Sequence, residues 1–519
     1  MKFEKNLIIA SFIFNIMKNI TTSIILPIIL ISIGWGLPNF SWASVEVDGI
    51  CYELDSLNNT AQVVSGQYQG DIIIPVDILY EGKTYSITSI GESAFTNGYV
   101  LSVTIGDNVT TIGKKAFYYC HALKSVTLGK GVTTIGELAF SECANLRTIT
   151  IPGNVSNVGP KAFEHCLLLA SVVIEDGVSM ISQRAFALCY GLIDLSIGNG
   201  VETIGDMAFY ACLSLTSVVV PNSVTIIGEM AFQNCDELKT VTLGDGVKTI
   251  GSGAFSMSEE LSSLTMGENV TTIGDGAFYQ CWKLSSVTIP ASVVFIGNNA
   301  FRECQSLEKV TINSDSIMSK DYCFSSMFGN SVKEFVIGEG VTTIGEEAFE
   351  NNWMSKLSLP SSLESIGMGA FKSCYNLESV IIPDGVTEIK EFTFYLCASL
   401  TSVTIGSQVK SIGNFAFSSC QSLTSITVRR ESPASIWSST FSEFDKSKCT
   451  LYVPQGSKSA YETADYWKEF PNIVESQTCL ETVRTDEPSE CLYDLQGRKL
   501  KETPRQGFGI RDGHLIHHQ

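Results

Sequence analysis

Phenylalanines recur along most of this sequence at a nearly constant interval, and the apolar and polar residues around each one follow the same order. The phenylalanine, usually preceded by alanine, occupies sixteen positions, and nine consecutive steps between them are 23 residues long. The positions are 95, 117, 140, 163, 186, 209, 232, 255, 278, 301, 324, 349, 371, 394, 417 and 441. A period in the twenties is typical of a solenoid, in which each repeat forms one coil.

One repeat contains two apolar segments with different periods. In LKSVTL (residues 123–128) the last four positions alternate apolar and polar, which predicts a half-buried strand with Val126 and Leu128 facing the core. The next residues, GKG, predict a turn. In ELAFSEC (residues 137–143) the apolar residues share one side of a predicted short helix or 3₁₀ turn. Such a coil buries its apolar side only by stacking on neighbouring coils.

The consensus L-x-x-L-x-L, followed by a turn and V-x-x-I-G-x-x-A-F-x-x-C, resembles the repeat of the BspA-like surface proteins of anaerobic bacteria. The resemblance extends over roughly residues 85–475, and the solenoid itself is expected over residues 85–448 with about sixteen units. It implies a leucine-rich repeat fold, a curved right-handed coil with a parallel β-sheet on its concave face and short helical or 3₁₀ turns on the other wall. It also implies binding to host matrix proteins or to other cells, and it supplies no catalytic residues.

The N-terminal segment differs from the repeats. Residues 1–43 combine a few lysines with apolar runs and end in small residues, which predicts a signal peptide cleaved between Ala43 and Ser44. Translation from Met17 would by itself give a well-proportioned signal peptide. A membrane anchor is the alternative, but the prolines and glycines of the apolar run favour cleavage. Residues 44–84 are expected to form a β cap on the first coil.

The C-terminal segment also lacks the repeat. Residues 449–475 predict a strand, a helix from Ser457 to near Phe470, and a second strand that cap the last coil. Residues 476–490 are polar and predict a linker. Residues 491–519 predict a pair of hairpins and resemble the C-terminal sorting tails of exported Bacteroidetes proteins, although the ending HLIHHQ departs from their usual finish.

Charge excludes some partners. The formal net charge is −20, and removal of residues 1–43 would leave it near −22. An acidic exterior repels phosphate, so nucleic acids and anionic lipids are excluded as partners. With the signal peptide cleaved, we expect no membrane span and a location in the medium or at the outer cell surface.

Cysteines recur with the repeat. Eleven of the 16 cysteines follow the repeat phenylalanine by three residues. These are Cys120, Cys143, Cys166, Cys189, Cys212, Cys235, Cys281, Cys304, Cys374, Cys397 and Cys420. Their unbroken order favours a ladder of buried thiols over disulfides between coils, although the distance between coils would permit bridging. One cysteine per coil is too few for a metal site, and Cys479 and Cys491 are the more plausible disulfide.

No constellation for catalysis stands out. Of the five histidines, three lie in the last six residues, and no zinc-protease, nucleophile-elbow or phosphate-loop motif occurs. Glycine-rich stretches such as GDGVKTIG recur with the repeat and are turns. Acidic turn residues could attract calcium, but one carboxylate per coil is a poor site. We therefore expect no enzyme activity and no cofactor.

Candidate binding residues are those that break the pattern. Outward strand positions are mostly Ser or Thr, as good strand formers would be. The exceptions on the strand face are Asp194, Lys309, Glu334 and Lys356. The unit at 313–330 loses the Ile-Gly pair and the ladder cysteine, which predicts either a hinge between repeat blocks or a recognition surface that includes Tyr322, Phe328 and nearby Trp353.

Two function classes are consistent with this sequence. The first is a surface or secreted protein that binds or adheres to host matrix proteins, host cells or other microbes through the solenoid. The second is a structural spacer without a partner, and a secreted enzyme is the least supported. The oligomeric state and the ligand do not follow from the sequence.

Overall fold

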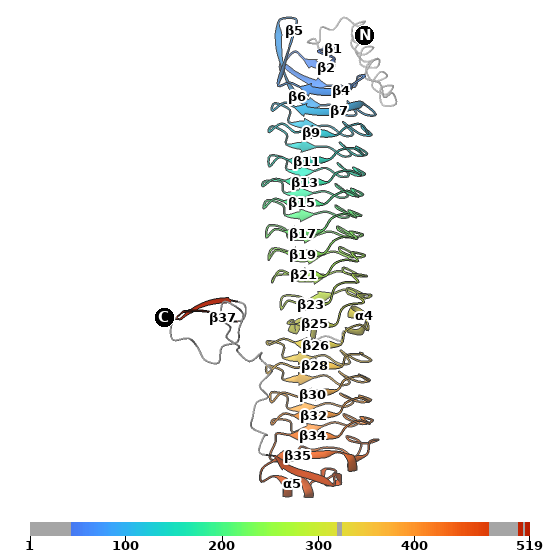
Figure 1. Ribbon diagram of the computed structural model, residues 1–519, viewed down its shortest axis with the longest axis vertical. Coiled ribbons are helices and arrows are strands. Elements are labelled where there is room, and N and C mark those ends of the chain that lie inside the picture. Colours follow the sequence, from blue (N-terminus) through green and yellow to red (C-terminus); the bar gives the residue numbers. More distant parts are fainter. Residues whose placement is uncertain (1–42, 319–323, 477–506, 512–513, 519) are drawn as a thin grey trace, which may run out of the picture. The chain divides into compact units, whose positions relative to one another are not determined.

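The computed structural model describes residues 43–318, 324–476, 507–511 and 514–518. They fall into two compact units, one ending at Leu192 and the other beginning at Ile193. In each unit the chain forms a parallel β-solenoid with little helix, whose coils stack one on the next (Figure 1). The predicted fold class is thereby confirmed.

Each coil contributes a strand to a wall that we call the long-strand wall. In the first unit these strands are β4 (Gln69–Ile74), β7 (Tyr99–Ile105), β9 (Ser125–Thr127), β11 (Thr148–Ile151) and β13 (Ser171–Ile174). In the second unit they are β15 (Asp194–Ile197), β17 (Ser217–Val220), β19 (Thr240–Leu243), β21 (Ser263–Thr265), β23 (Ser286–Ile289), β25 (Lys309–Ile312), β26 (Glu334–Ile337), β28 (Lys356–Ser358), β30 (Ser379–Ile381), β32 (Ser402–Ile405) and β34 (Ser425–Val428). Their residues alternate between the core and the outside, as the sequence predicts.

Each regular coil also has a second strand, which was not predicted from the sequence. The two residues before the recurrent glycine, such as Thr134 and Ile135, pair in parallel with the same residues of the neighbouring coils. In the first unit these strands are β8 (Thr111–Ile112), β10 (Thr134–Ile135), β12 (Asn157–Val158) and β14 (Met180–Ile181). In the second unit they are β16 (Thr203–Ile204), β18 (Ile226–Ile227), β20 (Thr249–Ile250), β22 (Thr272–Ile273), β24 (Phe295–Ile296), β27 (Thr343–Ile344), β29 (Ser365–Ile366), β31 (Glu388–Ile389) and β33 (Ser411–Ile412).

Consecutive turns take the place of the expected short helices in the A-F-x-x-C segment. The amide of Ala139 donates to Gly136 within its coil, whereas the next amide, that of Phe140, donates to Ala162 of the following coil at 2.7 Å. Leu138 and Glu142 adopt left-handed backbone conformations, with φ of 58° and 63°. This conformation costs about 1–2 kcal/mol per non-glycine residue, and the hydrogen bonds between coils offset it.

Phenylalanine rings stack along the core. Phe209, Phe232, Phe255 and Phe278 are fully buried, and consecutive ring centroids lie 5.1–5.3 Å apart with nearly parallel planes. This spacing is close to the distance between strands of a sheet, so one ring per coil fills the core without gaps.

The ladder cysteines are free and buried, as the sequence predicts. These thiols have a further role, because sulfurs along the ladder donate to the carbonyl oxygen of the phenylalanine in the preceding coil. Cys143 donates to Phe117 at 3.2 Å, and Cys281 donates to Phe255 at 3.3 Å. Ser258 occupies the same place in its coil and donates its hydroxyl to Phe232. The thiol therefore satisfies a buried backbone acceptor in addition to filling space.

The buried thiols are expected to resist alkylation in the folded protein. Burial raises the pKa of Cys189 and of Cys235 to about 12, so almost no thiolate exists at pH 8. Incubation with iodoacetamide at pH 8, followed by peptide mass spectrometry, should leave the ladder peptides unmodified. In urea the same peptides should react fully, and modification of native protein at the unfolded rate would contradict the structure.

Both ends of the repeats are capped. At the N-terminal end, β1 (Ala43–Val47), β2 (Ile50–Asp55), β3 (Thr60–Val63), β5 (Asp77–Tyr80) and β6 (Lys83–Ile90) form antiparallel pairs that lead into the first parallel coil. At the C-terminal end, η1 (Lys446–Lys448) precedes β35 (Thr450–Pro454), and β36 (Asn472–Ser476) pairs with β35. Farther along, β37 (Gly507–Arg511) and β38 (His514–His518) form an antiparallel pair.

The single helix expected from Ser457 to near Phe470 is wrong. The structure has α5 (Lys458–Thr463) and the 3₁₀ helix η2 (Trp467–Glu469), because Tyr466 adopts a left-handed conformation between them. This break lets Trp467 bury its ring beside Phe441, the last ring of the stack. The cap thus closes the aromatic core.

The long-strand wall is interrupted. In the second unit its sheets are β17-β19-β21, β23-β25-β26-β28 and β30-β32-β34-β35-β36, so no ladder joins β15 to β17, β21 to β23, or β28 to β30. At every one of these breaks a proline follows the next strand: Pro221, Pro290 or Pro383. Proline has no N–H, whereas Gly244 at the same place in its coil donates to Val220.

Leucine is the second feature of the breaks. The strand before each break carries Leu195, Leu264 or Leu357 at its first inward position, where most other strands have Val or Ile. Proline alone does not break the wall, since Pro360 and Pro454 end strands that still pair with the coil before them. Leucine is not required either, because in the first unit β9 carries Val126 before the break that Pro152 follows.

Candidate functional site

The coil that breaks the repeat contains the two helices α3 (Asp315–Met318) and α4 (Phe324–Phe328). Asp315 anchors α3, because its carboxylate accepts hydrogen bonds from the amides of Thr342 and Thr343 in the next coil. Ile317 and Met318 of α3 are buried in place of the lost repeat residues. The described residues of the irregular coil therefore contribute to the core as those of regular coils do.

Phe328 was predicted to belong to a binding surface, and this prediction is wrong. Its ring is fully buried and stacks on Phe301 with a centroid distance of 5.3 Å. Phe324 lies one helical turn earlier and stacks on Phe349 at 4.9 Å. Two rings at positions i and i+4 of α4 thus continue the aromatic stack through the irregular coil. Tyr322 lies outside the described residues.

Three of the predicted surface residues lie together on the long-strand wall. Lys309, Glu334 and Lys356 occupy the same register position on β25, β26 and β28. The Lys309 Nζ and Glu334 Oε1 atoms are 2.9 Å apart. In the preceding column Glu308 forms an ion pair with Lys333. We call these five residues the charged row. The sign of the charge alternates between neighbouring residues of one coil and from one strand to the next.

The ion pairs of the charged row are exposed and contribute little to stability. Exposed pairs are typically worth about 0–1 kcal/mol, because water screens the charges and two long side chains must be ordered. A fixed pattern of alternating charges instead favours one partner over others. The charged row is thus better suited to recognition than to stabilisation.

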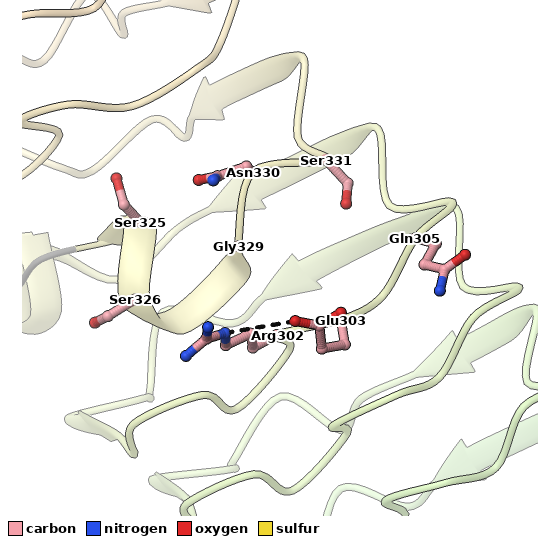
Figure 2. A pocket seen from close by; sticks show the side chains of 8 residues that line it. All are labelled: Arg302, Glu303, Gln305, Ser325, Ser326, Gly329, Asn330 and Ser331. Atoms are coloured by element: carbon pink, nitrogen blue, oxygen red, sulfur yellow. Dashed lines mark ion pairs between the residues drawn. The ribbon is translucent and has the colours of Figure 1, made fainter.

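A pocket of about 390 Å³ lies at the corner where α4 ends (Figure 2). Its side chains come from α4, from the segment after it and from the preceding coil. They are Arg302, Glu303, Gln305, Ser325, Ser326, Asn330 and Ser331, with Gly329 completing the wall. Arg302 Nε lies 3.7 Å from Glu303 Oε1, so the pocket is polar but locally neutral. We call it the corner pocket.

Trp353 supplies an exposed aromatic side chain to this region. It is 58% exposed, and it follows Asn352, whose amide donates to Ser325 Oγ of the corner pocket. Three residues later the chain reaches Lys356 of the charged row. The corner pocket, Trp353 and the charged row therefore lie on the irregular coil and the coils next to it, and we treat them together as the candidate surface.

Asp194 does not belong to this surface. It begins β15, several coils away from β25, and it is exposed. The structure describes six of the seven predicted surface residues. Five of them lie on α4 or on the coils next to it, one of those five, Phe328, is buried, and Asp194 lies apart. The corner pocket was missed, because its residues are ordinary Ser, Asn and Gln whose proximity depends on the path of α4.

In the described ranges, no three His, Cys, Asp or Glu side chains lie together as metal ligands would. The same part of the chain contains no helix with the length and apolar character of a membrane span. The predicted Cys479–Cys491 disulfide, the linker and the Gln496-Gly497 hairpin lie outside the described residues.

Comparison with known proteins gives one family. The profile of the BspA type leucine rich repeat region, six copies, matches residues 88–216, 202–329 and 318–448. No curated protein sequence matches significantly.

Several solved structures of bacterial proteins are similar. A leucine-rich repeat protein from Bacteroides ovatus is 26% identical, covers 74% of this chain and 94% of its own, and has a TM-score of 0.48. A leucine rich cell surface protein from Faecalibacterium prausnitzii is 24% identical, covers 85% and 97%, and has a TM-score of 0.28. The pneumococcal vaccine antigen PcpA is 19% identical, covers 84% and 99%, and has a TM-score of 0.32.

Proposed function

Since this chain belongs to the family of BspA-type leucine-rich repeat proteins, we propose that it is an exported protein, displayed at the cell surface, that binds proteins of a host matrix, of host cells or of other microbes. The signal peptide expected over residues 1–43 and the tail resembling sorting segments support export. Leucine-rich repeat solenoids present an extended surface on which binding residues change while the scaffold is kept.

The observation that carries this proposal is a cluster of residues that depart from the Ser/Thr pattern of the long-strand wall. The outward positions of the long-strand wall are mostly Ser and Thr, yet the charged row, the corner pocket and Trp353 gather around one irregular coil. A spacer has no need for such a cluster. Tryptophan is among the residues that most often dominate the energy of a protein interface, and Trp353 is exposed.

Trp353→Ala is expected to weaken partner binding at least 10-fold, because tryptophan anchors dominate interface energies. Lys356→Glu should weaken it as well, since it places a second carboxylate next to Glu334. Purified residues 44–475 should be screened against immobilised extracellular-matrix and epithelial proteins, and the affinity of each hit measured by surface plasmon resonance.

Trp437→Ala is the matched control. Trp437 is 59% exposed and lies outside the irregular coil, so its removal should leave binding unchanged. Equal loss in both tryptophan variants would show that binding is not located at the irregular coil. If no protein binds the native chain, the spacer function gains support and the adhesive one is abandoned.

A further inference from the structure

A second hollow lies at the first break in the long-strand wall of the second unit. It has a volume of about 470 Å³, is open to solvent, and is lined by residues of β15, β17, β19 and the turns after them. The residues that matter for its chemistry are Leu195, Ile197, Asn199, Val219, Pro221 and Thr242. We call it the proline slot.

The floor of the proline slot is apolar. Leu195 and Ile197 occupy inward strand positions but are only partly buried, whereas Val218 and Val220 at the same positions of the next coil are almost fully buried. Val219 stands at the rim and is 65% exposed. Exposed aliphatic surface at core positions is unfavourable in water, and covering it would be favourable.

The walls of the slot are strand edges. Because no ladder joins β15 to β17, the facing backbone groups are not paired with each other. Unpaired edges of this kind accept hydrogen bonds from an extended chain, which places alternate side chains into neighbouring pockets. This geometry favours an extended segment over a helix.

The charge beside the proline slot indicates which residues the bound segment carries. No charged residue lines the slot, but Asp194 directly precedes Leu195 and is exposed. Among the described residues, no ion pair joins Asp194 to a basic side chain. A lysine or arginine next to the inserted aliphatic residue would therefore meet an unpaired carboxylate.

The same arrangement recurs, which indicates that it is built into the fold. Leu264 and Met266 are partly buried before the break that Pro290 follows, and Leu357 and Leu359 are partly buried before the break that Pro383 follows. Strands not followed by a break bury their inward residues, as β19 does with Val241 and Leu243.

We propose that the proline slot binds an extended segment of a partner protein, with a leucine- or valine-sized side chain over Leu195 and Ile197 and a basic residue beside Asp194. This adds a second surface to the proposed function and does not depend on the charged row. The two surfaces can therefore fail independently.

A defined peptide tests the proposal. The fluorescein-labelled peptide TKVLVKT should bind residues 44–475 in fluorescence anisotropy with a roughly micromolar Kd. TKSGSKT, without the aliphatic residues, and TEVLVET, without the basic ones, should bind at least 10-fold more weakly. Leu195→Asn and Val219→Lys should each lower the affinity for TKVLVKT about 10-fold, and Asp194→Asn about 3-fold at low salt. Equal binding of the three peptides, or affinity unchanged in the Leu195 and Val219 variants, would overturn the proposal.

Pro221→Gly separates the slot from general loss of structure. Glycine restores the N–H that Gly244 uses in the next coil, so we expect a bond to the Ile197 carbonyl, slower hydrogen exchange over residues 217–221, and loss of peptide binding. Slower exchange with full peptide affinity would contradict the proposed site. Trp353→Ala should keep full affinity for TKVLVKT. If hydrogen exchange in Pro221→Gly is not slowed, the peptide affinities of the Leu195 and Val219 variants still test the proposed site.

Discussion

Replacing Phe232 by alanine is expected to lower the free energy of unfolding of the second unit by about 3–5 kcal/mol. The ring is fully buried between Phe209 and Phe255, with centroid distances of 5.1 and 5.2 Å. Its removal leaves a cavity that the coils cannot close, because the backbone of Phe232 remains hydrogen-bonded to Ala254. In a solenoid the loss extends to both neighbouring interfaces.

Urea unfolding followed by circular dichroism measures this effect, and Phe295→Ala is its matched control. Phe295 is 44% exposed on the second strand of its coil, so its truncation should cost about 1 kcal/mol or less. Phe232→Leu should lie between the two, since it keeps most of the buried volume. Equal costs for Phe232→Ala and Phe295→Ala would show that the ring stack is not a main source of stability.

Alkaline pH is expected to unfold the protein progressively, starting near the pH at which free thiols ionise. Burial raises the pKa of Cys235, Cys374 and Cys420 to about 12. In the unfolded chain a thiol ionises near pH 8.5, so between about pH 8.5 and 12 the unfolded state loses protons that the folded state retains. The contribution of these thiols to the free energy of unfolding is fully present below pH 8.5 and is lost as the pH rises from about 8.5 to 12. Each thiol contributes roughly 1 kcal/mol per pH unit.

Cys235→Ser isolates one thiol from the other groups that titrate in this range. Serine fits the position, because Ser258 makes the equivalent hydrogen bond to Phe232 in its own coil. Urea midpoints measured with a reductant at pH 7.5, 9 and 10 should fall more steeply for the native chain than for the variant. Parallel midpoints would mean that Cys235 ionises with an ordinary pKa in the folded state.

The core was largely predictable from the sequence. Phe232 and Cys235 recur with every coil, and each coil contacts its neighbours in the same way, so one repeat determines which positions are buried throughout. The hydrogen bond of each thiol was not predictable, because it joins the sulfur to a carbonyl of another coil. The sequence shows a thiol that is buried but not the acceptor that it meets.

The candidate surfaces were predictable only in part. Lys309, Glu334 and Lys356 break the Ser/Thr pattern at one repeat position, and for that reason they lie in register on adjacent strands. Phe328 was misassigned, because the irregular segment no longer follows the repeat and α4 carries it inward. The proline slot could not be predicted from Pro221 alone, because strands that end at or just before Pro360 and Pro454 still pair with the coil before them.

The sequence by itself determined the coil, its period and the inward or outward direction of each regular residue, because these depend on local pattern and on stacking identical neighbours. Only the tertiary structure decided where the sheet breaks, which ring fills the stack in the irregular coil, and which surface residues meet at the corner pocket. Those features depend on backbone pairing between coils that differ from the repeat, and the energy of such pairing is not encoded in any single coil.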